Sequence, residues 1–147
     1  MSMIESVIKE VFPENSEEYR IIVESYNILN SSTPQIAAEY KNRLMILDKL
    51  RTELSSLYFM ITRNINQIRN SYQRDYDAQY VRLVKIGRPS HNAIESEIRF
   101  NSPDYVTSSL KIEELDNVRN LINSYIRGID SVKNTTVELL RDSRRID

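Results

Sequence analysis

The residues of this sequence best suited to chemistry are cations and tyrosines interspersed between positions 63 and 88. Arginine binds phosphate through two parallel hydrogen bonds, and an aromatic ring can stack on any nucleic-acid base. Grooves that hold single-stranded nucleic acid combine these two groups along the path of the strand. The segment therefore predicts a nucleic-acid-binding surface. Its candidate residues are Arg63, Arg69, Arg74, Tyr76, Arg82, Lys85 and Arg88.

The same residues are also consistent with a purely structural role, and the sequence leaves both interpretations open. Tyr72 continues an apolar helical stripe, which favours a place in the core. Tyr76 follows four residues later and falls on the same helix face. The arginines are equally consistent with a solvated helix surface, or with pairing to acidic residues of a neighbouring subunit.

Little else in the chain suits catalysis or metal binding. His91 is the only histidine and there is no cysteine, so one chain cannot build a zinc site from these ligands. No glycine-rich phosphate loop and no nucleophile elbow occurs. Glu95 and Glu97 are two residues apart, so their side chains diverge on a helix. We therefore expect no enzymatic activity, no cofactor and no metal.

Charge is distributed unevenly, although the formal net charge is only −1. Residues 1–40 carry seven acidic side chains against two basic ones, whereas residues 61–88 carry six basic against two acidic ones. Electrostatic binding depends on the local charge. The overall balance is therefore compatible with anion binding by the middle of the chain.

Apolar residues at alternating steps of four and three predict two long helices that pack through narrow stripes. One stripe runs from Tyr40 to Tyr72 and the other from Leu115 to Leu139. An antiparallel helical hairpin is the simplest packing, and parallel pairing between subunits is the alternative. The residues expected in the core or in oligomer contacts are Leu47, Leu54, Ile61, Ile65, Ile68, Ile122, Tyr125, Ile129 and Val132.

Arg51 is the one break in the first stripe. A polar residue at such a position either fixes the register or oligomeric state, or extends its charged end to the edge of the contact. The second interpretation is the simpler one.

Turn and capping residues divide the chain, which we expect to form one all-α domain over residues 1–147. Pro13 ends a first short helix, and Ser16 caps a second one. Thr33 before Pro34 predicts the start of a long helix. The expected segments are acidic N-terminal helices over 1–33, the long core helix over 34–83, a linker with a short helix over 84–107 and a C-terminal helix over 108–145.

No apolar run approaches the ~18 residues that a membrane-spanning helix needs. The first residues have no basic segment followed by an apolar one, so we expect no secretory signal. The lack of cysteine fits a reducing compartment. The sequence predicts a soluble, cytoplasmic protein without membrane contact.

The segment Thr33–Asn42 resembles the start of the core helix in the UvsY-type recombination mediators of tailed phages. Those proteins have a Thr-Pro step, a small apolar stretch and a Lys/Glu-Tyr step at this place. The similarity extends over residues 16–145 as an order of helices. The later segments that resemble the family are Ser96–Ile98, Leu110–Ile112 and Lys133–Leu139.

The resemblance implies a non-enzymatic homo-oligomer that binds single-stranded DNA in the host cytoplasm. Its implied partners are a recombinase, which it helps to load, and a single-strand-binding protein. Where the family has a basic stretch, two adjacent tyrosines and a glycine, this chain reads Ile68–Tyr76 without adjacent tyrosines or a glycine. Arg69, Arg74 and Tyr76 would take that place.

A second hypothesis explains the stripes equally well. In it the chain is a helical structural or adaptor protein, such as a virion connector or coiled-coil scaffold, without nucleic-acid binding. The basic middle then pairs with an acidic N-terminal segment.

Overall fold

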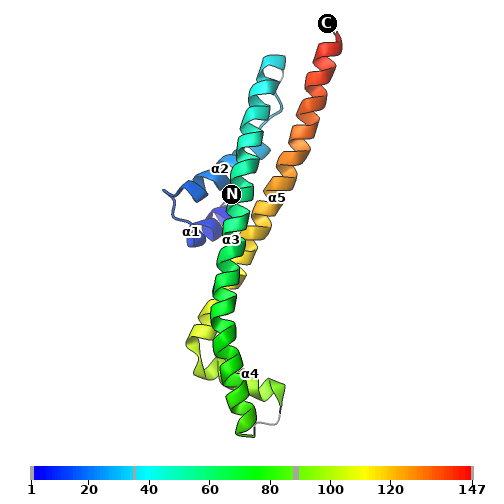
Figure 1. Cartoon of the computed structure of the whole chain (residues 1–147). Coiled ribbons are helices and arrows are strands. Elements are labelled where there is room, and N and C mark those ends of the chain that lie inside the picture. Colours follow the sequence, from blue (N-terminus) through cyan, green and yellow to red (C-terminus); the bar gives the residue numbers. More distant parts are fainter. Residues whose placement is uncertain (1, 35, 88–89, 147) are drawn as a thin grey trace. The chain divides into compact units, whose positions relative to one another are not determined.

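The described residues, 2–34, 36–87 and 90–146 of the computed structural model, form an all-α fold without a strand. Figure 1 shows the helices in sequence colours. The all-α prediction is confirmed. The helices are α1 (Ser2–Val11), α2 (Glu17–Leu29), α3 (Ala37–Lys85), α4 (His91–Asn101) and α5 (Pro103–Ile146).

The chain forms two compact units, and α3 and α5 each contribute to both. The terminal unit comprises residues 1–60 and 118–147, and the middle unit comprises residues 61–117. The terminal unit therefore holds α1, α2, the first half of α3 and most of α5. The middle unit holds the second half of α3, α4 and the start of α5.

The N-terminal helices begin and end where the sequence predicts. α1 ends at Val11, two residues before Pro13, which cannot continue a helix. The Ser16 hydroxyl accepts a hydrogen bond from the Tyr19 backbone N–H at 3.2 Å, so it caps α2.

The start of the long helix was predicted wrongly. α3 begins at Ala37, so Thr33 and Pro34 precede it instead of forming its cap and first turn. The chain has to reverse direction between α2 and α3, and this turn needs the extra residues. Arg43 donates to the Ser31 hydroxyl at 3.0 Å and to the backbone carbonyl of Ile28 at 3.4 Å. These bonds hold the connection against the first turns of α3.

The predicted linker over 84–107 is also corrected, because most of it is helical. α3 continues to Lys85 and is followed by Gly87, whose φ of 88° suits the left-handed position after a helix. Only Ser102 separates α4 from α5, which begins at Pro103 instead of residue 108. Proline is well tolerated in the first turn of a helix, since the N–H it lacks has no helical partner there.

In the terminal unit α3 and α5 pack against each other in antiparallel directions. Asp48 pairs with Lys133, and Arg51 pairs with Asp130. The residue number rises along α3 while the number of its partner falls along α5, so the two helices are antiparallel. Between the helices lie buried stripe residues from both. Those buried in this unit are Tyr40, Leu47, Leu54, Val118, Ile122, Tyr125 and Ile129, together with Leu50 and Leu57.

The residues expected in the core or in oligomer contacts differ in burial. Ile61 and Ile65 are fully buried in the middle unit. Ile68 and Val132 are only partly buried. Leu50 and Leu57 were not expected in the core, because they lie beside the narrow stripe. The buried face of α3 is therefore wider than a strict coiled-coil seam.

Arg51 extends to the edge of the contact, in agreement with the simpler of its two interpretations. Its guanidinium Nε donates to Asp130 Oδ1 at 2.6 Å, and both side chains stay more than two-fifths exposed. Asp130 raises the pKa of Arg51 through this hydrogen bond.

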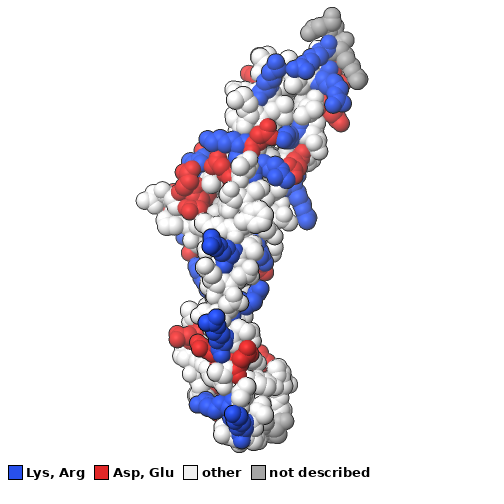
Figure 2. Space-filling view, in the orientation of Figure 1, with Lys and Arg blue, Asp and Glu red and all other residues white. Residues whose placement is uncertain are grey.

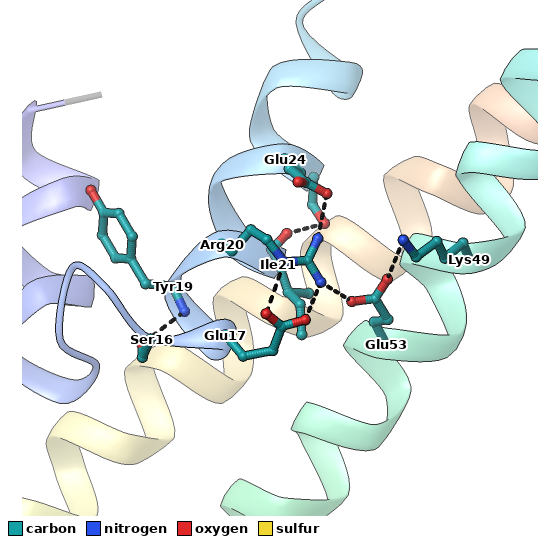
Figure 3. A network of polar contacts seen from close by, with 9 residues as sticks. Ser16, Glu17, Tyr19, Arg20, Ile21, Glu24, Lys49 and Glu53 are labelled. Carbon is teal, nitrogen blue, oxygen red and sulfur yellow. Dashed lines mark hydrogen bonds and ion pairs between the residues drawn. The ribbon is translucent and has the colours of Figure 1, made fainter.

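A network around Arg20 connects α2 to α3 within the terminal unit (Figure 3). The Arg20 guanidinium donates to Glu17 and Glu24 of its own helix and to Glu53 of α3, the last at 2.6 Å. Lys49 lies 3.9 Å from Glu53. One arginine thus bridges the two helices.

The middle unit has its own small core. Leu83 of α3 is buried with Ile94 and Ile98 of α4, and Tyr76 and Tyr80 pack against them. α4 is capped by the Ser90 hydroxyl, which accepts from the Ala93 N–H at 3.2 Å. No helix in the described residues is long and apolar enough to cross a membrane.

Candidate nucleic-acid interface

The predicted binding cations lie on the second half of α3, in the middle unit. The side chains of Arg63, Arg69, Arg74, Arg82 and Lys85 are all exposed. None of these five forms an ion pair within the described ranges. Arg88, also predicted for this surface, lies outside the described residues.

Three of these cations share one face of α3. Arg63, Arg74 and Lys85 are 11 residues apart, just over three helical turns, so they follow one another at steps of about 16.5 Å. This face lies roughly opposite the buried Ile61 and Ile65. Figure 2 shows separate blue patches over this part of α3, with red atoms beside them.

The predicted stacking residue Tyr76 belongs to an aromatic cluster. Its ring stacks on Tyr105 of α5 with centroids 5.4 Å apart, and it lies 6.0 Å from Tyr80. Tyr72 meets Tyr105 edge to face at 5.2 Å. Both Tyr72 and Tyr76 are half-buried. Each ring therefore packs against other aromatic rings of the unit and is partly exposed.

The environment of Tyr76 favours its neutral phenol. Partial burial raises its pKa above the ordinary value of 10.0, and the carboxylate of Glu95 and the neighbouring tyrosines add to the effect. The ring therefore presents an uncharged surface and a hydroxyl group at neutral pH.

A groove of about 440 Å³ opens beside these rings, and we call it the tyrosine groove. It lies entirely within the middle unit, between α3 and the end of α4 and the start of α5. Its lining contains carboxylates and hydroxyl groups but no lysine or arginine. The lining residues used below are Tyr72, Asp75, Tyr76, Gln79, Asp104 and Tyr105.

Two of the predicted cations lie in hollows that adjoin the tyrosine groove. Arg74 lines a hollow that shares Ser71 and Asp75 with the groove. Arg82 lines another hollow that shares Gln79 and Ser102 with it. Tyr76 lines only the groove, which shares lining residues with the separate hollows of Arg74 and Arg82. Arg63, Arg69 and Lys85 are not among its lining residues.

Acidic residues balance these cations within the unit. Residues 61–117 contain eight basic and eight acidic side chains, so the middle unit has no net formal charge. The acidic ones come mostly from α4 and α5. Any anion binding must therefore depend on how the cations of α3 are placed, not on the total charge of the unit.

The sequence did not indicate that Tyr105, Asp104 and Gln79 would take part in this site. Asp104 and Tyr105 join it because α5 starts at Pro103, which puts Tyr105 in the first turn against Tyr76, and Gln79 of α3 donates a hydrogen bond to the Ser102 hydroxyl. The sequence Ser102-Pro103-Asp104 could have predicted this helix start, since proline and an acidic residue are common in the first turn of a helix.

The chain was compared with protein-family models, with curated proteins and with solved structures, and none of them matches it.

Proposed function

We propose that this protein is a non-enzymatic recombination mediator that binds single-stranded DNA through the middle unit. The observation that carries the proposal is the set of five exposed cations on α3 without ion-pair partners in the described ranges. Arg63, Arg74 and Lys85 form a row along one face of α3, which suits an extended phosphate backbone. The resemblance of Thr33–Asn42 to phage mediators supplies the context, with a recombinase and a single-strand-binding protein as partners in the host cytoplasm.

The tyrosine groove supports a single strand over a duplex. Bases in a duplex are stacked on one another, whereas those of a single strand are free to stack on aromatic side chains. Tyr72 and Tyr76 keep part of their rings open at the groove between Arg74 and Arg82. The hollows of Arg74 and Arg82 adjoin this groove, so phosphate contacts there would lie next to the base contacts, whereas Arg63 and Lys85 lie on the opposite face of α3.

The proposed mediator is a homo-oligomer, and its assembly needs surfaces other than the stripes. The stripe residues of the terminal unit are buried within one chain, so they are not free to pair with a second copy. Met45 and Phe59 of α3 are 71 % and 70 % exposed and fall near the same helix face, since they are 14 residues apart. Repeating a modest DNA site around an oligomer would strengthen binding through multivalency.

A helical adaptor or scaffold protein without nucleic-acid binding is the second candidate. The balanced charge of the middle unit favours it, because the acidic residues there weaken long-range attraction for DNA. Val81, Val84, Ile86 and Phe100 are also exposed in this unit, and such apolar side chains suit protein contacts.

Charge-removing variants distinguish the candidates. We expect Arg63→Ala, Arg74→Ala and Lys85→Ala together to weaken binding to oligo-dT and to reduce the salt slope, because each phosphate contact on a single strand adds about −0.7 to that slope. The helix should persist, since alanine has the highest helix propensity. Fluorescence anisotropy of a labelled strand measures both quantities.

A matched control removes three cations of the terminal unit through Lys41→Ala, Arg127→Ala and Arg141→Ala. These side chains are also exposed on helices, and the net charge changes by the same amount. Equal losses of affinity in the two triple variants would contradict a local binding face on α3.

A further inference from the structure

We infer that the tyrosine groove receives one base of the bound strand and prefers bases that carry an exocyclic amino group. The inference rests on the proposed single-stranded-DNA binding and adds a base preference to it. Cytosine is the simplest such base for a test, and thymine is the pyrimidine that lacks the amino group.

The path of the strand follows from the adjoining hollows. Arg74 and Arg82 are eight residues apart on α3, which corresponds to about 12 Å along the helix. We place one phosphate at each arginine and the strand between them beside the groove, since the groove shares lining residues with both hollows. Its intervening base would be free to enter.

The groove is large enough and has suitable walls for a base. Its volume of about 440 Å³ falls within the usual range for small-molecule sites. Tyr72, Tyr76 and Tyr105 line the groove and supply aromatic surface. A neutral ring is the partner that stacking on a base requires.

The polar groups of the groove determine which base fits. Asp75 and Asp104 are exposed, and neither forms an ion pair in the described part of the chain. An ionised carboxylate only accepts hydrogen bonds, so it needs a donor such as the N4 amino group of cytosine. The corresponding O4 of thymine is an acceptor and would face the carboxylate unfavourably.

The same carboxylates explain why the groove does not hold a phosphate. No lysine or arginine lines it, and a phosphate there would be repelled by two carboxylates. Arg74 and Arg82, which line the two adjoining hollows, would bind the phosphates instead. Base and phosphate are thus assigned to neighbouring hollows of the middle unit.

The test compares short oligo-dC and oligo-dT strands of equal length by anisotropy at neutral pH. We expect the full-length protein to bind oligo-dC about tenfold more tightly, the effect of one good hydrogen-bonded base contact. The double variant Asp75→Asn with Asp104→Asn should lose this preference, because an amide presents donors as well as an acceptor. Its general affinity should rise, since two negative charges are removed.

The matched control is Asp77→Asn with Glu113→Gln. These residues lie on the same two helices, are exposed and do not line the groove, and the change in net charge is identical. This variant should keep the preference for oligo-dC. Helical circular dichroism checks that both variants fold.

The outcomes separate the inference from the proposed function. Equal affinity of the unmodified protein for both strands overturns the base preference and leaves DNA binding intact. Binding to neither strand overturns the proposed function itself. A preference that survives in the Asp75 and Asp104 variant overturns the assignment to these two carboxylates.

Discussion

At the residue scale, Gly128 sets how closely α2 approaches α5 in the terminal unit. A Cβ atom at this position would lie 3.1 Å from Cδ2 and 3.3 Å from Cδ1 of Leu29. The contact is close, but the atoms belong to the end of a flexible side chain. A small group is therefore accommodated more easily than a branched one.

We expect Gly128→Ala to change the free energy of unfolding by less than about 1 kcal/mol, because the gain in helix propensity offsets the tight contact. Gly128→Val should destabilise by about 1–3 kcal/mol through overpacking against Leu29. Urea unfolding followed by circular dichroism measures both. Asn134→Val, at an exposed position of α5, is the control for the branched side chain alone. If Asn134→Val lowers the free energy of unfolding as much as Gly128→Val does, the loss does not come from the contact with Leu29.

Individual side chains were predictable where a local rule governs them. Ser16 caps α2 because its hydroxyl reaches an N–H three residues away, which the sequence specifies. Tyr76 was not predictable in the same way. Its main neighbour, Tyr105, is distant in sequence, and its position depends on where α5 begins.

At the element scale, the attachment of α2 to α3 depends on charge as well as on apolar packing. Ile21 and Ile22 bury the inner face of α2, while Arg20 reaches Glu53 on α3. The hydrogen bonds from Arg20 lower the pKa of Glu17 below its ordinary value of 4.5. A carboxyl group with a lowered pKa stabilises the fold above its unfolded pKa, and this contribution is lost as the pH falls through the folded pKa.

We expect Arg20→Ala to lower the urea midpoint at neutral pH, since it removes the bridge between the helices and leaves Glu17, Glu24 and Glu53 without their shared cation. The difference from the unmodified protein should shrink as the pH falls from about 4.5 through the lowered pKa of Glu17, because protonation of that carboxyl group removes its interaction with Arg20. Urea unfolding at neutral and acidic pH tests this.

Arg127→Ala is the matched control, because Arg127 is exposed and forms no ion pair in the described ranges. A difference for Arg20→Ala that stays constant across the pH range would show that packing, and not the ion-pair network, attaches α2.

The helices themselves were largely predictable, because their stripes persist over several heptads and only Gly87 and Gly128 are available for turns. The residues at which the helices begin and end were harder to predict. The prediction placed Pro34 in the long helix and Pro103 in the linker, whereas Pro34 precedes α3 and Pro103 begins α5. Proline fits both the loop before a helix and its first turn, so the path of the chain decides which occurs.

At the scale of the whole molecule, the chain divides into two compact units, to which the proposed function assigns different roles. The terminal unit holds the long buried stripes, and its exposed Met45 and Phe59 suit assembly. The middle unit holds the predicted binding cations and the tyrosine groove. The sequence predicted the basic segment but not the acidic residues that α4 and α5 bring to the same unit, because they follow from tertiary packing.

Fluorescence anisotropy of labelled oligo-dT, titrated with the protein at ~50 mM and ~200 mM salt, tests the central claim most directly. If the five exposed cations of α3 each contact a phosphate, affinity should fall about 100-fold between these two conditions. A duplex of the same length should bind more weakly, because its bases cannot reach the tyrosine groove. Undetectable binding of the single strand at the lower salt concentration would contradict the account, and the basic face of α3 would then be a protein-contact surface.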